Sequence, residues 1–216
     1  MATPQGCRLT RELPQNYREM GMKDSLINQF ISKERFGSYK SVDEYMENLT
    51  FSKNSYIPLS VLEITLRNAI NNFLSVKVGT YWYEDANFLT KDSIRKIEEA
   101  KNVLQNRRES VSKNKIIAEL SLGFWVNLFK KPYDKKLRIN ELKRIFPNLP
   151  SAKEKLINRE VLYRELNHIR NFRNRVFHYE KVINKNNYNS VHDEIFEILS
   201  YFDSELKRFA DATNRI

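Results

Sequence analysis

The fold class of this chain is decided by one stretch, residues 158–179, which reads NREVLYRELNHIRNFRNRVFHY. At about 100° per residue, its large apolar side chains fall in a single sector of a helix. These side chains are Leu162, Leu166, Ile169, Phe172 and Val176. An amphipathic helix of this length has to bury its apolar sector against other elements. The stretch therefore predicts a long helix that packs on a hydrophobic core.

The rest of the chain follows the same helical pattern. Only 5 glycines and 6 prolines occur in 216 residues, which is few for the many tight turns of a sheet-rich fold. We expect an all-α protein of about eight helices, over residues 22–36, 41–49, 55–76, 90–110, 115–131, 135–146, 158–179 and 191–209. Residues 1–20 are expected to be a polar lead-in, and residues 21–216 to form one helical domain.

The charge balance is strongly basic. Lys and Arg total 37 against 27 Asp and Glu, which gives a net charge of +10 and an isoelectric point near 9.6. Such a domain either binds a phosphate-rich polymer or has a merely solubilising surface. The single cysteine, Cys7, excludes a disulfide framework and a cysteine-based zinc site. No apolar segment resembles a signal peptide or a membrane span, so we expect a soluble, cytoplasmic protein.

Cationic groups crowd the second half of residues 158–179. Arg170, Arg173, Arg175 and His178 lie there, and only Glu180 offers local compensation. The pattern indicates either a basic face for an anion or a reaction site. A line of amides runs beside them, because Asn167, Asn171, Asn174 and His178 recur at spacings of four, three and four residues. Asn is disfavoured inside helices, so this line favours contact with a ligand or with another chain.

Arg173 is exceptional, because a regular helix places it inside the apolar sector. Burying a guanidinium without a partner costs several kcal/mol, so Arg173 needs a fixed partner or a position on an interface. Glu63 offers one counter-ion, but Glu63 also lies four residues before Arg67, which favours a local pair. A purely structural reading, with buried Arg and His satisfied by neighbours, remains open.

Four segments together resemble a known family. The block Arg173-Asn174-Arg175-Val176-Phe177-His178 is similar to the signature of the HEPN superfamily. Three more segments, ISKERFGSY, LSVLEITLRNAI and IAELSLGFWVNLF, resemble conserved parts of the Abi-like (AbiD/AbiF-type) proteins of bacterial abortive infection, in the family's order. One departure is His178-Tyr179-Glu180, where the family commonly has a second histidine in place of Tyr179.

The resemblance implies a HEPN-type helical bundle that forms a two-fold homodimer with one composite site. It implies a metal-independent RNA endonuclease without a cofactor, in which Arg173, Asn174 and His178 are catalytic. It further implies a toxin of phage defence that a noncoding RNA antitoxin restrains. Glu63, Arg67 and Tyr179 are expected in supporting roles.

Basic residues in two segments fit an RNA substrate. Phosphates bind Lys and Arg patches with little sequence information. From the helix we expect RNA contacts by Arg170, Asn171, Arg175 and Asn167, and from residues 130–144 by Lys135, Lys136 and Arg138. The aromatic residues Trp82, Tyr81, Tyr83 and Trp125 are expected in the core rather than against bases.

The two other histidines fit structural roles better than catalytic ones. His168 is expected to be a satisfied surface residue and His192 to cap a helix start. Three histidines without suitable spacing do not predict a metal site. Two other functions stay open: a non-catalytic RNA-binding module, and a nucleotide-binding HEPN partner of a nucleotidyltransferase that modifies Tyr179.

Overall fold

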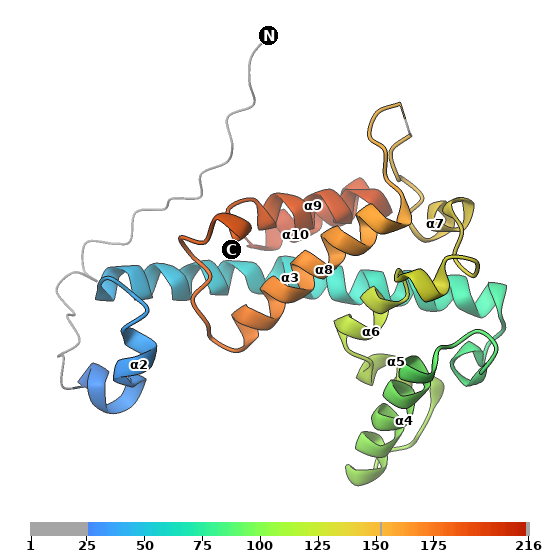
Figure 1. Ribbon diagram of the computed structural model, residues 1–216, viewed down its shortest axis with the longest axis horizontal. Helices are drawn as coiled ribbons and strands as arrows, with labels where there is room; N and C mark the ends of the chain where they lie inside the picture. The colour runs from blue at the N-terminus through green and yellow to red at the C-terminus, as the bar shows by residue number, and fades with distance from the viewer. Residues whose placement is uncertain (1–25, 152, 215–216) are drawn as a thin grey trace. The chain divides into compact units, whose positions relative to one another are not determined.

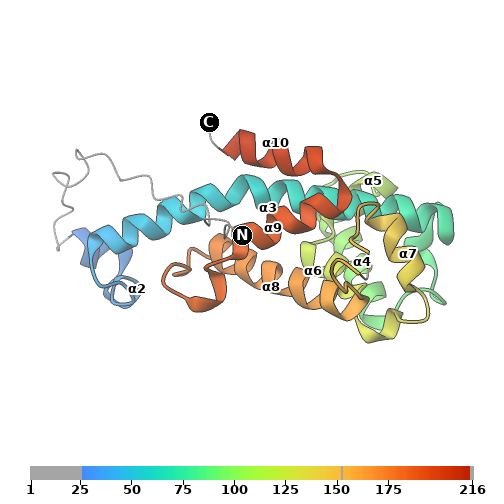
Figure 2. The same ribbon diagram turned by 90° about the horizontal axis from the view of Figure 1, so that it is seen from above.

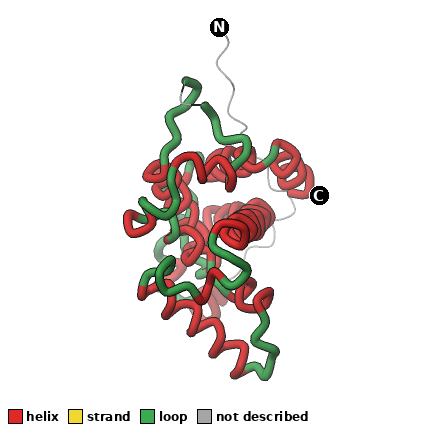
Figure 3. Tube along the Cα trace, turned by 90° about the vertical axis from the view of Figure 1, so that its right-hand side faces the viewer, coloured by secondary structure: helices red, strands yellow, loops and turns green. Residues whose placement is uncertain are grey.

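The computed structural model describes residues 26–151 and 153–214, and within these ranges it contains helices and loops but no strand (Figures 1 and 3). The all-α prediction is therefore confirmed for the described part of the chain. The α-helices are α2 Lys33–Phe36, α3 Val42–Lys77, α4 Lys91–Asn106, α5 Lys113–Glu119, α6 Leu122–Asn127, α7 Ile139–Ile145, α8 Arg159–Phe177, α9 Val191–Phe202 and α10 Ser204–Asn214. None of these helices is both long and apolar enough to cross a lipid bilayer.

Contacts between residues divide the chain into two compact units, residues 1–48 and 49–216. The expected polar lead-in, residues 1–20, lies outside the described residues. In the first unit the helix expected over residues 22–36 is interrupted at Ser32, whose φ is 74°. A π-helical turn, Ile27–Ile31, precedes this break and α2 follows it. The apolar spacing in this region predicted a continuous helix and gave no sign of the positive φ at Ser32.

The long helix α3 replaces two helices that the sequence predicted separately. Ser41 accepts a hydrogen bond from the backbone N–H of Glu44, as expected of an N-cap. The helix then continues through the Thr, Ser and Asn residues at 50–55 and through Pro58, although Pro58 has no N–H to donate. Phe51 packs edge-on against Phe172 of α8, with ring centroids 5.9 Å apart. This contact lies in the segment where a break was expected.

In the second unit, α8 packs against α6 on one side and α9 on the other, and α9 also packs against α10 (Figure 2). Two further predicted helices are broken. The stretch 115–131 forms α5 and α6, which are separated at Leu120 and Ser121, and the stretch 191–209 forms α9 and α10, which are separated at Asp203.

The core contains Trp82 and Trp125, whose indole N–H groups donate to Asn71 Oδ1 and Leu120 O. Tyr83 is buried as expected, whereas Tyr81 is exposed.

His192 does not cap α9, and that prediction is wrong. Its half-buried ring stacks on Phe51 of α3 at 4.7 Å, and its Nε2 lies 2.8 Å from Ser55 Oγ. Because the Ser55 hydroxyl donates to Phe51 O at 2.7 Å, the Nε2–H of His192 donates to Ser55. Burial lowers the pKa of His192, against the opposing effect of the Asp193 charge. The ring is thus a neutral link between α3 and α9.

Acid should weaken this link. Since the folded pKa of His192 is lowered, the unfolded chain takes up a proton more readily below about pH 6.5, and stability falls as the pH drops below that value. One such group contributes at most about 1.4 kcal/mol per pH unit. We expect His192→Phe, which keeps an aromatic ring without a titrating nitrogen, to flatten this acid dependence in urea unfolding between pH 7.5 and 5. An equally steep pH dependence in His192→Phe would contradict the assignment.

Candidate functional site

Helix α8 begins and ends close to the predicted positions. The Asn158 side chain caps its start by accepting the N–H of Val161 at 2.9 Å. At its end, the N–H of Tyr179 donates to Val176 O and the N–H of Glu180 donates to Arg175 O, which is the Schellman arrangement. Tyr179 has a φ of 57°, a conformation that usually belongs to Gly in this motif. His178, the C-cap, is therefore exposed at the very end of the helix.

The two faces of α8 are divided as the sequence predicted. All five apolar residues of the predicted sector are buried: Leu162, Leu166, Ile169, Phe172 and Val176. Asn171, Asn174 and His178 are exposed on the polar line. Asn167 is half-buried, and its Oδ1 is shielded from solvent without a hydrogen-bond partner among the described residues. The polar line therefore presents donors and acceptors that the described part of the chain leaves largely unused.

Arg173 has a fixed partner, and that partner is Glu63 of α3. The Nε of Arg173 lies 3.4 Å from Glu63 Oε2, with the two side chains 29% and 23% exposed. This contact is an ion pair without a hydrogen bond, because the solvent-shielded Nε has no hydrogen-bond partner among the described residues. The other carboxylate oxygen, Oε1, accepts the N–H of Leu122 at the start of α6 at 3.1 Å. Glu63 thereby connects α3, α6 and α8. Of the two alternatives left by the sequence, the structure has the long-range pair, while Arg67 donates to Asn68 Oδ1.

An aromatic surface lies beside Arg173 that the sequence analysis missed. The Arg173 guanidinium carbon lies 4.3 Å from the centroid of the Phe177 ring, one helical turn further on. Phe177 is partly exposed, and its ring centroid lies 6.1 Å from that of the exposed Tyr56 on α3. The spacing of four residues between Arg173 and Phe177 could have indicated this contact. The guanidinium is thus held between a carboxylate and a ring while part of it stays accessible.

Arg170 and Arg175 have different surroundings. A methyl group placed on Gly123 of α6 would lie 3.5 Å from Arg170 Cδ, so Arg170 runs along the glycine. The Nε of Arg170 is shielded from solvent and has no hydrogen-bond partner in the described ranges. Arg175 instead pairs with Glu180 at 2.6 Å, the local compensation that the sequence offered. Arg170 thus retains an unused donor, whereas the charge of Arg175 is partly neutralised.

The basic segment 130–144 does not lie beside His178. The Arg159 side chain, at the start of α8, contacts Phe129 O just before this segment and Asp134 within it. Fourteen residues separate Arg159 from Arg173, which is about 21 Å along a helix at ~1.5 Å per residue. Lys135 and Arg138 are exposed, but the Lys136 ammonium donates to the carbonyls of Asn87 and Phe88 at 2.7 Å each. Lys136 therefore has a structural role.

His168 is satisfied within the fold, as expected. Its Nδ1 lies 2.6 Å from Glu194 Oε2, and its ring stacks on Tyr188 at 5.3 Å. His178 thus differs from the other two histidines in being exposed beside the arginine block. In the ranges that the structure describes, no three His, Cys, Asp or Glu side chains gather as a metal site.

Comparison with family models, with curated proteins and with solved structures gives no match for this chain.

The contacts of Glu63 can be tested by a double-mutant cycle. We expect Glu63→Gln to reduce the free energy of unfolding by about 1 kcal/mol, because the charge opposite Arg173 is lost at a half-buried site. Glu63→Ala should reduce it by about 1 kcal/mol more, because the Leu122 N–H then loses its acceptor. In urea unfolding, the loss of unfolding free energy in the double variant Glu63→Gln with Arg173→Gln should differ from the sum of the two single losses by roughly 0.5–1 kcal/mol.

Arg164, which is exposed on the same helix, provides the matched control for this cycle. Arg164→Gln with Glu63→Gln should give additive effects within about 0.5 kcal/mol. Equal coupling for Arg164 and Arg173 would mean that the Glu63–Arg173 pair is not formed in solution.

Proposed function

We propose that this protein is a HEPN-type, metal-independent RNA endonuclease that acts as a homodimer. One observation carries the proposal: Arg173, held by Glu63 and Phe177, lies on the same helix end as the exposed His178 and Asn174. These three residues are also the ones that match the family signature in sequence. The exposed amides of Asn171 and Asn174 add donors for a polyanion.

The chemistry follows from the residue types. RNA carries its own nucleophile, the 2′-hydroxyl, next to each phosphate. In the proposed reaction one imidazole removes the 2′-hydroxyl proton, the 2′ oxygen bonds to phosphorus, and the bond from phosphorus to the 5′ oxygen breaks. A second, protonated imidazole donates a proton to the leaving 5′ oxygen, and the products carry a 2′,3′-cyclic phosphate and a 5′-hydroxyl. Imidazole titrates near pH 6.5 in water, which suits both proton transfers.

The remaining residues have electrostatic and positioning roles in this proposal. The Arg173 guanidinium stays protonated and stabilises the negative charge that builds on the phosphate oxygens. Asn174, one turn before His178, orients the imidazole or the phosphate without changing the local charge. Because one imidazole cannot readily be both acid and base at one bond, the second His178 comes from a two-fold related chain.

The biological role proposed here rests on the resemblance to Abi-like proteins. Under this proposal the nuclease is a toxin of phage defence, acts in the cytoplasm, and is held inactive by a noncoding RNA. A ribonuclease that cuts the RNA of its own cell harms that cell, so it requires such a restraint.

The activity is tested by incubating total cellular RNA with purified protein in EDTA. We expect cleavage by the wild type and a loss of at least about 100-fold in rate for Arg173→Ala and for His178→Ala, since each removes an acid–base or charge-stabilising group. Arg164→Ala, an exposed arginine on the same helix, is the matched control and should retain the wild-type rate within about twofold.

Two results would decide against cleavage by this site. Undiminished cleavage by pure His178→Ala would remove the imidazole from the reaction. RNA binding without any cleavage by the wild type would favour the non-catalytic RNA-binding module.

A composite site in the dimer predicts a dominant effect of the inactive chain. When wild type and His178→Ala are co-expressed at equal levels, about a quarter of the dimers carry two intact chains, so the rate should fall to about a quarter. Independent active chains should instead retain about a half. The measurement is the cleavage rate at several ratios of the two chains, with each ratio determined by mass spectrometry. A rate proportional to the fraction of wild-type chain would exclude a composite site.

A further inference from the structure

Two exposed aromatic rings lie beside the proposed catalytic residues. Phe177 of α8 is 40% exposed and Tyr56 of α3 is 58% exposed. Their ring centroids are 6.1 Å apart, and their planes are inclined by 34°. Large apolar side chains that gather at a surface usually mark contact with a ligand or with another chain. The pair is therefore a candidate binding surface.

Direct contacts join the pair to the proposed site. The centroid of the Phe177 ring lies 4.3 Å from the guanidinium carbon of Arg173, and Phe177 immediately precedes His178. On α3, Glu63 follows Tyr56 by about two helical turns and contacts Arg173. A group that lay on the two rings would thus be next to the guanidinium that is proposed to contact the phosphate.

The surroundings of the two rings are basic. Lys53, one turn before Tyr56 on α3, is exposed, and Arg67, about three turns after Tyr56, donates to the Asn68 amide. Neither cation has a carboxylate partner in the ranges that the structure describes. Two copies joined through this face would bring like charges together, whereas a polyanion would neutralise them. The charges therefore favour a nucleic acid over a second copy as the occupant.

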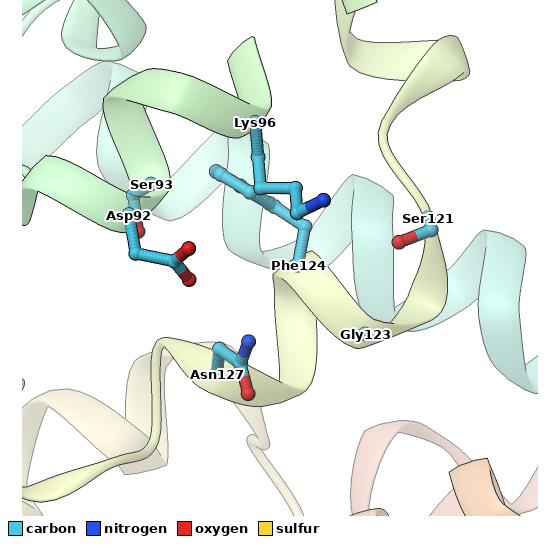
Figure 4. A pocket seen from close by; sticks show the side chains of 7 residues that line it. All are labelled: Asp92, Ser93, Lys96, Ser121, Gly123, Phe124 and Asn127. Carbon is cyan, nitrogen blue, oxygen red and sulfur yellow. The ribbon is translucent and has the colours of Figure 1, made fainter. Parts of the chain in front are cut away.

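The small pocket between α4 and α6 offers no comparable surface (Figure 4). Its volume of about 120 Å³ is smaller than the roughly 150 Å³ of a cavity that holds benzene. The Asp92 carboxylate and the Lys96 ammonium that line it are already paired with Arg95 and Glu99. Aromatic rings that are open to solvent can instead stack on the flat face of a base without any enclosed volume.

We infer that Tyr56 and Phe177 form a stacking surface for one nucleobase of the RNA, beside the phosphate that Arg173 contacts. Stacking on an aromatic side chain accepts any base, and its strength grows with the face that the base offers, so adenine binds more tightly than uracil. Lys53 and Arg67 lie along α3 on either side of Tyr56, where they suit the neighbouring phosphates. The inference rests on the proposed function, because it names a base-binding subsite for that RNA.

Equilibrium binding tests the inference without any need for cleavage. The probes are fluorescein-labelled eight-nucleotide oligoadenylate and oligouridylate, and the protein is His178→Ala in EDTA, so that the RNA stays intact. We expect oligoadenylate to bind about fivefold more tightly than oligouridylate, because adenine offers the larger face for stacking. Adding Tyr56→Leu, which removes the ring but keeps an apolar side chain, should weaken the binding of oligoadenylate about tenfold and reduce the preference to within about twofold.

Three further variants of the His178→Ala protein serve as matched controls. Tyr56→Phe keeps the ring and should retain the affinity for oligoadenylate within about twofold. Tyr81→Leu removes a ring that is 64% exposed outside this surface, and it should leave affinity and preference unchanged. Lys53→Gln should make the slope of log affinity against log salt concentration shallower by about 0.7, as for one lost phosphate contact, without changing the preference for adenine. Tyr56→Gln takes the place of Tyr56→Leu if that protein unfolds.

The possible results separate the stacking surface from the proposed nuclease. Equal binding of the two RNAs by the parent protein, or a preference that survives the loss of the Tyr56 ring, overturns the stacking surface even if the wild type cleaves RNA through His178. If Tyr56→Leu loses both RNA binding and the dimer mass in sedimentation equilibrium, Tyr56 belongs to a contact between two copies, which also overturns it. Weaker binding of oligoadenylate at an unchanged mass supports stacking, and it does so even if the wild type proves unable to cleave RNA.

Discussion

The proposed site depends on the contacts of the Glu63 carboxylate. One of its oxygens accepts the first free N–H of α6, and the other lies against the guanidinium of Arg173 on α8. A single side chain of α3 thus satisfies a helix start and a charge that falls inside an apolar sector. Without it, Arg173 would have to leave that sector or lose its charge partner, and the end of α8 would pack differently.

The three arginines at the end of α8 each have different neighbours. Arg173 is compensated by Glu63 and by the ring of Phe177, and Arg175 by Glu180. Arg170 runs along Gly123, where a larger side chain would come close to it. Each arginine has its own support, so several cations share one helix end. A rigid helix then presents these groups in a fixed geometry, which electrostatic stabilisation of a phosphate requires.

The distribution of charge fits the polyanion proposed as the ligand. The basic segment near Lys135 and Arg138 lies at the start of α8, about 21 Å along the helix from Arg173. A small ligand cannot contact both ends, whereas a polyanion can. The segment therefore fits a role in long-range attraction and backbone contact, and the block near His178 a role in local contact.

The sequence by itself determined the all-α class, the position and core face of α8, the cap at Ser41, and the need of Arg173 for a partner. These features depend on local periodicity and capping, which neighbouring residues fix. Only the tertiary structure decided that Glu63 pairs with Arg173, that Lys136 caps carbonyls and that His192 is buried against Ser55. The two helices predicted over residues 41–76 are joined into α3 across Pro58, where packing such as the contact of Phe51 with Phe172 overrides a weak local signal. Three other predicted helices are interrupted, at Ser32, Ser121 and Asp203, where the apolar period gave no sign of a break.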